Sequence, residues 1–588
     1  MKPWLALFIL LTLIIPRSIA ENINSLWSKV EQAEQKKLPK SAIKILDQIL
    51  ELTRQSQTRG HYLKALSKKI LNQAHILGKQ PRDKVKILRE KISSSPKADR
   101  PILQAILAIW FWHYHEQNRY KFSQRSTTSG LENEDFTTWD SPKLFHEVGS
   151  LFEQALKDRR HLRSLILKDF EPLVERGSLG YGYCKTLYEF LAREALRFYK
   201  HGLQTLPKPQ DAFEIEADSH ALSESENFLS YKPDTTDTDS LLLKALEIYQ
   251  ELLTYLKKTQ NEDAYLDTEI SRLIFFHENA LGTVKKERFR RRLQELVGQH
   301  PHSKLSALAT HQLAKLAEID QDLVLAVELC SGPISKFPGS SGATLCRNLT
   351  NRITAKEYNV KIEHTLNVSN SSALVEYKNL TTLHIRIVKD SWRRVLEEDW
   401  ANPGDHLNDQ QMQSILGKEP VAQWSVSLSE TSDYKQTSEE IDLPPLKYGY
   451  YRLLISHRSD FGRSSGNKVV QGAFWSTDTT LLLRRLNTKI QGLVVDARDG
   501  KPLQGRTIEI FKRGKRGRYG YFQSVQSKED GTFFFHKPEK NRYGTYLFYA
   551  RSTTGDVLFH EPMGHGNRRN KQVSRGVLFY TDRSLYRP

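Results

Sequence analysis

Cysteine is scarce in this sequence, with three residues among 588. A disulfide scaffold needs far denser cysteine, so buried apolar cores must supply most of the stability. Cys330 and Cys346 flank the turn residues 337–342 between two helical stretches, which places them nearly level across a helical hairpin. Two interpretations of this pair stay open, a disulfide or two buried small side chains. Cys184 has no evident partner in the sequence.

Long apolar runs are missing after the N-terminus. Residues 4–15 form a short apolar stretch behind Lys2, and residues 18–20 supply the small side chains that a signal peptidase reads. This stretch is too short to remain in a bilayer, and no later stretch approaches about 20 apolar residues. We therefore expect a signal peptide at residues 1–20, no transmembrane segment, and an exported protein that is periplasmic, at the cell surface or extracellular.

Motifs for the common catalytic chemistries are also missing. The sequence has no G-x-x-x-x-G-K-[ST] loop for nucleotide phosphates and no G-x-S-x-G nucleophile. His560 and His565 lie five residues apart with Pro562 between them, so they cannot share one helix face as zinc-binding histidines at i and i+4 do. We expect a protein that is not an enzyme and has no catalytic residue, cofactor or metal site.

Acidic residues are outnumbered, and the formal net charge is +18. The excess is largest from Lys489 onward, where 20 Lys and Arg stand against 9 Asp and Glu, and residues 511–522 are the densest part. Such a stretch indicates either a surface for an anionic partner or a solvated hairpin loop. Because the protein is expected to be exported, nucleic acid is a poor candidate partner.

The hydrophobic spacing divides the chain into two parts. Up to about residue 352 apolar residues recur every three or four positions, as in residues 42–50 behind Pro39, which is suited to open a helix. Near residue 358 the period becomes two, as in residues 382–390, 424–430 and 451–457, which predicts half-buried antiparallel strands. Tyr451, two residues after Gly449, has the spacing of a tyrosine corner, and Asp530-Gly531 predicts a hairpin.

The predicted architecture is a multidomain α-then-β chain, with an all-α array of helical hairpins similar to tetratricopeptide stacking, followed by antiparallel β-sandwiches. The predicted boundaries are 21–355 for the helical array with a loop insertion at about 203–239, 356–487 for the first sandwich, 488–563 for the second, 564–574 for a basic linker, and 575–588 for the start of one more domain.

The last residues carry the sharpest resemblance to a known family. Residues 580–588, YTDRSLYRP, resemble the opening of the second macroglobulin domain in the bacterial alpha-2-macroglobulin family. The matching residues are Thr581, Asp582, Arg583, Tyr586, Arg587 and Pro588. Residues 494–511 with 528–535 resemble a carboxypeptidase-regulatory or transthyretin-like sandwich, and residues 374–387 resemble the first macroglobulin-type domain. Residues 38–50 and 186–196 resemble the helical leader of large bacterial members.

The resemblance implies a chain longer than this one, in which a protease cuts a bait segment, macroglobulin domains rearrange, and the protease is trapped. Many members also bond to the protease through a Cys-Gly-Glu-Gln thioester, which this sequence lacks. We therefore expect the N-terminal scaffold region of an exported endopeptidase inhibitor, with proteases as partners of the full-length parent and a cell-envelope protein as partner of the helical array.

Two alternatives stay open. The first is a stand-alone extracytoplasmic module that binds a protein or a glycan, because stacked helices offer a long concave surface. The second is the leading region of an enzyme whose catalytic domain lies downstream.

Overall fold

The computed structural model describes residues 22–54, 58–78, 81–123, 135–174, 183–206, 212–368, 371–392, 407–463, 466–486, 489–514, 518–536 and 544–563. These residues form two compact units. The first is helical and contains the described residues up to Asp320 together with Glu328–Arg347, and the second contains Gln321–Val327 and the residues from Asn348 onward. Among the described residues, no helix combines the length and the apolar character that crossing a membrane requires.

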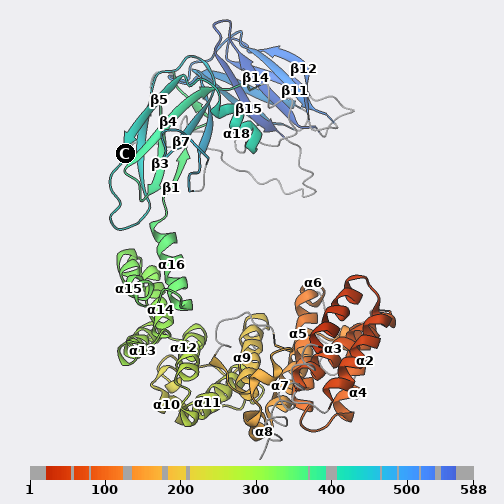
Figure 1. Cartoon of the computed structure of the whole chain (residues 1–588). Coiled ribbons are helices and arrows are strands. Elements are labelled where there is room, and N and C mark those ends of the chain that lie inside the picture. The colour runs from red at the N-terminus through yellow and green to blue at the C-terminus, as the bar shows by residue number, and fades with distance from the viewer. Residues whose placement is uncertain are drawn as a thin grey trace, which may run out of the picture. The chain divides into compact units, whose positions relative to one another are not determined.

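The first unit is a succession of helices (Figure 1). Residues 22–35 are helical. The later α-helices, of which the last two are shared with the second unit, are α2 (Pro39–Thr53), α3 (Arg59–Ile76), α4 (Pro81–Ser94), α5 (Arg100–Gln117), α6 (Arg119–Ser123), α7 (Ser141–Leu156), α8 (Arg159–Ser164), α9 (Leu187–Thr205), α10 (Ser225–Ser230), α11 (Leu241–Thr259), α12 (Glu262–Asn279), α13 (Lys285–Gln299), α14 (Ser306–Ile319), α15 (Leu323–Lys336) and α16 (Ser341–Thr354). Short 3-10 helices are η1 (Phe136–Thr138), η2 (Leu167–Phe170) and η4 (His220–Leu222).

Local signals in the sequence explain where these helices start. Pro39 opens α2, as its fixed φ and missing N–H favour at a first turn. The Asp140 carboxylate accepts a hydrogen bond from the Lys143 N–H at 2.9 Å and so caps α7. Each long helix then turns an apolar stripe toward its sequence neighbours, so that α2 packs on α3, α3 on α4, α4 on α5, α5 on α7 and α7 on α9.

The segment around residues 212–239 differs from the predicted loop insertion. Ile215, Ala221 and Phe228 are buried in the core of the helical unit. The backbone at 215–217 is bridged to Leu281. The segment also contains the short elements η4 and α10. The segment is acidic and polar, but its few apolar residues pack against α11, α12 and α13. Local composition cannot reveal this packing.

The second unit contains two β-sandwiches, and the predicted order of helices followed by antiparallel sandwiches is confirmed. The first sandwich has the elements β1 (Glu357–Lys361), β2 (Thr365–Leu366), β3 (Ser371–Lys378), β4 (Thr382–Lys389), α18 (Asp409–Leu416), β5 (Ala422–Ser427), β6 (Thr437–Leu443), β7 (Gly449–Ser456) and β8 (Val470–Ser476). Its sheets are β1-β3-β6 and β2-β8-β7-β4-β5, and every pairing is antiparallel except that of β2 with β8.

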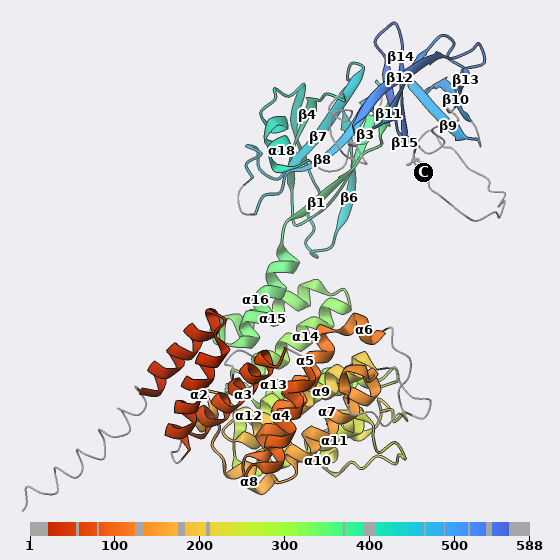
Figure 2. The same ribbon diagram turned by 90° about the vertical axis from the view of Figure 1, so that its right-hand side faces the viewer.

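The second sandwich has the strands β9 (Thr479–Arg485), β10 (Lys489–Asp496), β11 (Thr507–Arg513), β12 (Tyr519–Gln526), β13 (Thr532–His536), β14 (Tyr546–Arg551) and β15 (Val557–Met563). Its sheets are β13-β10-β9 and β12-β11-β14-β15, and Figure 2 shows these strands grouped together. The predicted boundary at residue 487 falls inside this sandwich, because β9 pairs with β10 along its whole length. Strand periodicity identifies β9 as a strand but not the sheet that it joins.

The turn between β3 and β4 connects the last helix to the first sandwich. Asn379 has a left-handed backbone, with φ of 58°. Its side-chain amide donates hydrogen bonds at 2.8 Å to the carbonyls of Ile353 and Ala355, where α16 ends. Terminal helix carbonyls have no partner within the helix, so this amide satisfies two groups at the point where the hydrophobic period changes.

Candidate functional site at the sandwich joint

The two sandwiches of the second unit are connected by two residues, Thr477 and Asp478, which lie between β8 and β9. Both residues are buried. The buried carboxylate of Asp556, in the turn before β15, accepts hydrogen bonds from the hydroxyls of Thr477 at 2.6 Å and Thr479 at 2.5 Å. The Tyr448 hydroxyl donates to the Asp478 carboxylate at 3.0 Å. The connection is therefore held from both sandwiches and is not a free linker.

An aromatic cluster lies beside this connection. The indole of Trp392 stacks on the Tyr549 ring, with centroids 4.0 Å apart and planes inclined by 19°. Trp475 lies 5.0 Å from Tyr450 and 6.4 Å from Tyr549. Trp392, Tyr450 and Trp475 come from the first sandwich, whereas Tyr549 lies on β14 of the second. We call this cluster and the residues 477–479 and 556 the joint.

Strand β7 gives the first sandwich a second apolar face, which packs against the second sandwich and α18. All eight of its residues are buried, whereas the sequence predicts a half-buried strand. Tyr451, Leu453 and Ile455 face the core between the sheets. On the other face, Tyr450 enters the core of the second sandwich and Leu454 packs beneath α18, which Figure 2 shows beside β4 and β7. The predicted tyrosine corner is present, because the Tyr451 hydroxyl donates to the Lys447 carbonyl at 2.9 Å.

A buried ion group fixes the segment that carries Trp392. The Asp390 carboxylate accepts hydrogen bonds from Arg452 Nε at 2.6 Å and from Lys418 Nζ at 2.9 Å. Burial disfavours the charged carboxylate, but these hydrogen bonds outweigh burial and lower the pKa of Asp390. The Asp390 N–H also donates to the Tyr450 carbonyl at 2.9 Å, so the chain enters the joint in a fixed position.

This ion group makes the stability of the first sandwich depend on pH. A lowered folded-state pKa stabilises the fold above the unfolded pKa, and that contribution is lost as the pH falls through the folded value. We expect Asp390→Asn to lower the free energy of unfolding by about 1.5–3 kcal/mol at neutral pH. The difference from the unaltered protein should shrink below a pH of about 4. Urea unfolding of both proteins at several pH values measures this difference in the free energy of unfolding.

Asp409→Asn is the matched control for this experiment, because Asp409 forms a surface pair with Arg463 at 2.6 Å and is largely exposed. Its effect should stay below about 1 kcal/mol. An Asp390→Asn defect of the same size at neutral and acidic pH would contradict the assignment.

A second polar cluster lies in the helical unit, where His115, Glu116 and His201 converge. Among the described residues, these three side chains form a group that could hold a metal ion, because their ligand atoms all lie within 4.8 Å of one another. Burial lowers the pKa of His115, which favours the neutral imidazole. Burial opposes ionisation of Glu116, but hydrogen bonds from Arg119 and the histidines outweigh it and lower the pKa of Glu116. His115 and Glu116 are adjacent in the chain and His201 is distant, so no sequence motif indicates the cluster.

The solved structures that partly resemble this chain include two of a bacterial protein. The crystal structure of native alpha-2-macroglobulin from Escherichia coli spanning domains NIE-MG1 is 15% identical with a TM-score of 0.26, and the match covers 35% of this chain and 97% of that chain. The structure spanning domains MG0-NIE-MG1 is 14% identical with a TM-score of 0.25, covering 35% of this chain and 64% of that chain. No protein family description and no curated protein matches this sequence.

Several of the predicted features lie outside the described residues. These are the signal peptide at 1–20, the basic linker at 564–574 and the motif residues Thr581, Asp582, Arg583, Tyr586, Arg587 and Pro588. His560 lies on strand β15 and not on a helix, whereas His565 lies outside the described residues. In the basic segment 511–522, residues 511–513 lie on β11 and residues 519–522 on β12, which pair as a hairpin, whereas residues 515–517 lie outside the described residues.

The structure brings Cys330 of α15 and Cys346 of α16 together. Both side chains are buried. A hydrogen bond to Cys330 and burial raise the pKa of Cys346 well above its usual range. Burial also raises the pKa of Cys184 to about 12. The thiols of Cys184 and Cys346 should therefore react slowly in the folded protein, because the thiolate is the nucleophile.

The disulfide between Cys330 and Cys346 stays a prediction. We expect that protein exported through an oxidising compartment, unfolded without reductant and treated with a thiol reagent, is labelled at Cys184 and at neither of the other two. Prior reduction should allow all three to react. Labelling of Cys330 and Cys346 without reduction would show two buried thiols instead, and peptide mass spectrometry distinguishes the outcomes.

Proposed function

We propose that this chain is the N-terminal scaffold region of an exported, alpha-2-macroglobulin-like endopeptidase inhibitor, and that protease entrapment belongs to the full-length parent. The joint is the observation that carries the proposal. Trapping by rearrangement needs domains that move as rigid bodies, so that cleavage at one point displaces others. Two sandwiches connected by two buried, hydrogen-bonded residues behave as one body, because rotation would expose Trp475 and take the Thr477 hydroxyl away from the Asp556 carboxylate.

The sequence adds support from outside the described residues. The motif at residues 581–588 resembles the start of a further macroglobulin domain, and residues 1–20 resemble a signal peptide. We propose an exported protein located in the periplasm, at the cell surface or outside the cell. In this role the region is not catalytic, and proteases bind the full-length parent protein. The helical unit binds a protein of the cell envelope.

The alternative function is a stand-alone extracytoplasmic module that binds a protein or glycan. One observation favours it, a cleft of 570 Å³ in the helical unit. Its lining includes acidic, basic and aromatic side chains, among them Glu262, His300, Lys304 and Phe337. Such a mixture suits recognition of a polar ligand.

The native gene product separates the two proposals. An antibody raised against the second unit recovers the product from its source, and mass spectrometry maps its peptides. The scaffold proposal predicts peptides that continue beyond Pro588 into further sandwich domains. A native product that ends at Pro588 would favour the stand-alone module.

A further inference from the structure

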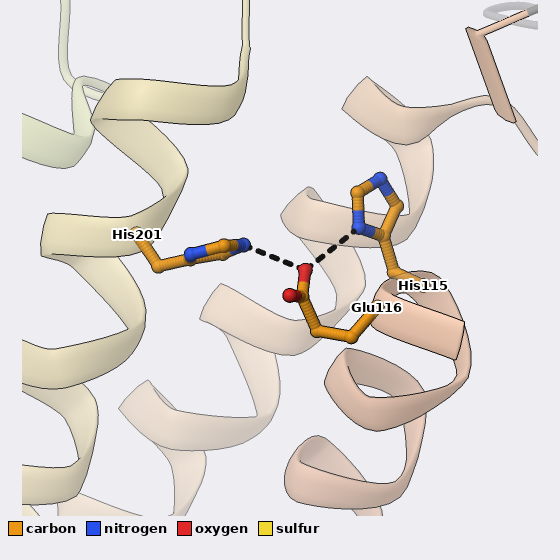
Figure 3. Close-up of side chains that lie close together, drawn as sticks. All are labelled: His115, Glu116 and His201. Carbon is orange, nitrogen blue, oxygen red and sulfur yellow. Dashed lines mark hydrogen bonds and ion pairs between the residues drawn. The ribbon is translucent and has the colours of Figure 1, made fainter. Parts of the chain in front are cut away.

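Two imidazoles and one carboxylate converge between helices α5 and α9 (Figure 3). His115 and Glu116 lie near the end of α5, and His201 lies near the end of α9. Glu116 Oε1 lies 3.4 Å from His115 Nδ1 and 2.7 Å from His201 Nε2. Three potential ligand atoms from two helices therefore face one small volume.

Aromatic packing holds both rings in place. His115 is buried and meets Phe145 edge-on, with centroids 4.9 Å apart. The His201 ring stacks on Phe145 at 6.2 Å and lies 5.5 Å from Trp112. Packing of this kind restricts the rotamers, so the nitrogen atoms are preorganised. The side chains of Glu116 and His201 remain 29% and 20% exposed, which leaves a way in for an ion and for water.

The neighbouring polar groups suit a metal-binding histidine. His115 Nε2 lies 3.0 Å from the Ser141 hydroxyl at the start of α7, which can accept the Nε2 proton. In this tautomer Nδ1 presents a lone pair toward Glu116 Oε1 and can bind a metal ion held between the two atoms, whereas in the other tautomer the Nδ1–H donates to Oε1 without a metal. Metal-binding histidines commonly donate the N–H of the ring nitrogen that does not bind the metal, as His115 Nε2 would to Ser141. On the other side, the Thr205 hydroxyl lies 3.2 Å from His201 Nε2.

Arg119 is a cation that competes for the carboxylate, but it pairs with Oε2 of Glu116, whereas the two histidines contact Oε1. In a tetrahedral zinc site with ligand bonds of about 2.1 Å, neighbouring ligand atoms lie about 3.4 Å apart. The separation of His115 from Glu116 already has this value. His201 Nε2 lies 2.7 Å from Glu116 Oε1 and must move away from that oxygen by about 0.7 Å, which its partial exposure permits.

We propose that His115 Nδ1, Glu116 Oε1 and His201 Nε2 bind a divalent transition-metal ion of the zinc class, with water as the fourth ligand. Two imidazoles and one carboxylate form a donor set that suits zinc, whereas magnesium and calcium prefer oxygen ligands alone. The ion connects α5 to α9, two helices distant in sequence, and stabilises the helical unit because it binds the folded state. This revises the expectation from sequence that the chain has no metal site.

The test uses the full chain, stripped of metal by a chelator and then titrated with zinc chloride. The unaltered protein should bind a zinc ion and show a higher melting temperature with zinc than without it. Glu116→Gln keeps the side-chain shape, and we expect it to weaken zinc binding at least about ten-fold and to remove the zinc-dependent shift. His201→Gln should do the same. Circular dichroism in the absence of zinc checks that both variants keep their helices.

His113→Gln is the matched control, because His113 is an exposed histidine on the same helix α5 and lies outside the cluster. It should bind zinc as the unaltered protein does. X-ray absorption of the zinc-loaded, unaltered protein gives a readout that needs no variant, with two imidazole ligands expected. A protein that shows no zinc-dependent shift, equal binding by all variants, or a spectrum without imidazole ligands would overturn the proposal.

Discussion

Replacing Trp475 with alanine is expected to lower the free energy of unfolding of the second unit by about 3–5 kcal/mol. The indole is 1% exposed and is the largest of the fully buried side chains. It belongs to β8 of the first sandwich but packs in the core of the second, against Tyr450 and Tyr549. Its removal leaves a cavity that neither sheet can close without moving the joint. Amide hydrogen exchange in β8 and β14 measures the loss, because exchange reports local opening energies.

Tyr521→Ala on strand β12 is the matched control, since the ring is 62% exposed. It should change stability by no more than about 0.5 kcal/mol. If Trp475→Ala accelerates exchange in β8 alone and leaves β14 as in the unaltered protein, the two sandwiches do not behave as one body.

Replacing Arg272 with methionine is expected to cost the helical unit about 3–5 kcal/mol, because the buried Glu269 carboxylate loses its hydrogen-bond donor and is left with Arg292 at 3.9 Å. Arg272 and Glu269 are both fully buried on α12, and Arg272 Nε donates to Glu269 Oε2 at 2.8 Å. Arg272 also donates to the carbonyls of Ala221 at 2.5 Å and Ser223 at 3.0 Å. The substitution therefore removes two of the hydrogen bonds that attach residues 221–223 to α12. Hydrogen exchange over that segment should rise with the loss of helical stability.

The double variant Arg272→Met with Glu269→Leu separates charge from packing. Removing both charges avoids a buried carboxylate that has lost the hydrogen bonds from Arg272, so the double variant should be more stable than Arg272→Met alone. A double variant that loses the sum of the two single effects would indicate that Glu269 and Arg272 act independently.

Particular residues show what the sequence could predict. The change of hydrophobic period near residue 356 indicates the fold class, because an amphipathic helix and a half-buried strand require different spacings. Local chemistry also sufficed for Tyr451 at the tyrosine corner and for the turn at Gly531, whose φ is 74°. The predicted hairpin at Asp530-Gly531 is wrong, because the strands on its two sides, β12 and β13, belong to different sheets. Each of these features depends on residues close together in the chain.

Features that depend on distant residues could not be predicted. The sheet that β9 joins is decided by pairing with β10 and not by its own pattern. Trp392 stacks on Tyr549, which lies 157 positions later in the sequence, and His201 meets Glu116 across 85 positions. No periodicity records such contacts, and a single histidine on a helix is more often a packed core residue than a ligand. The joint and the His115 cluster therefore emerge only from the three-dimensional arrangement.

Protease entrapment by the native product is the most direct test of the proposed function. The product recovered from its source is incubated with an endopeptidase and separated by gel filtration. We predict that the endopeptidase elutes with the product, loses activity on a large protein substrate and keeps activity on a short peptide substrate. An endopeptidase that elutes alone and cleaves both substrates at its original rate would contradict the account.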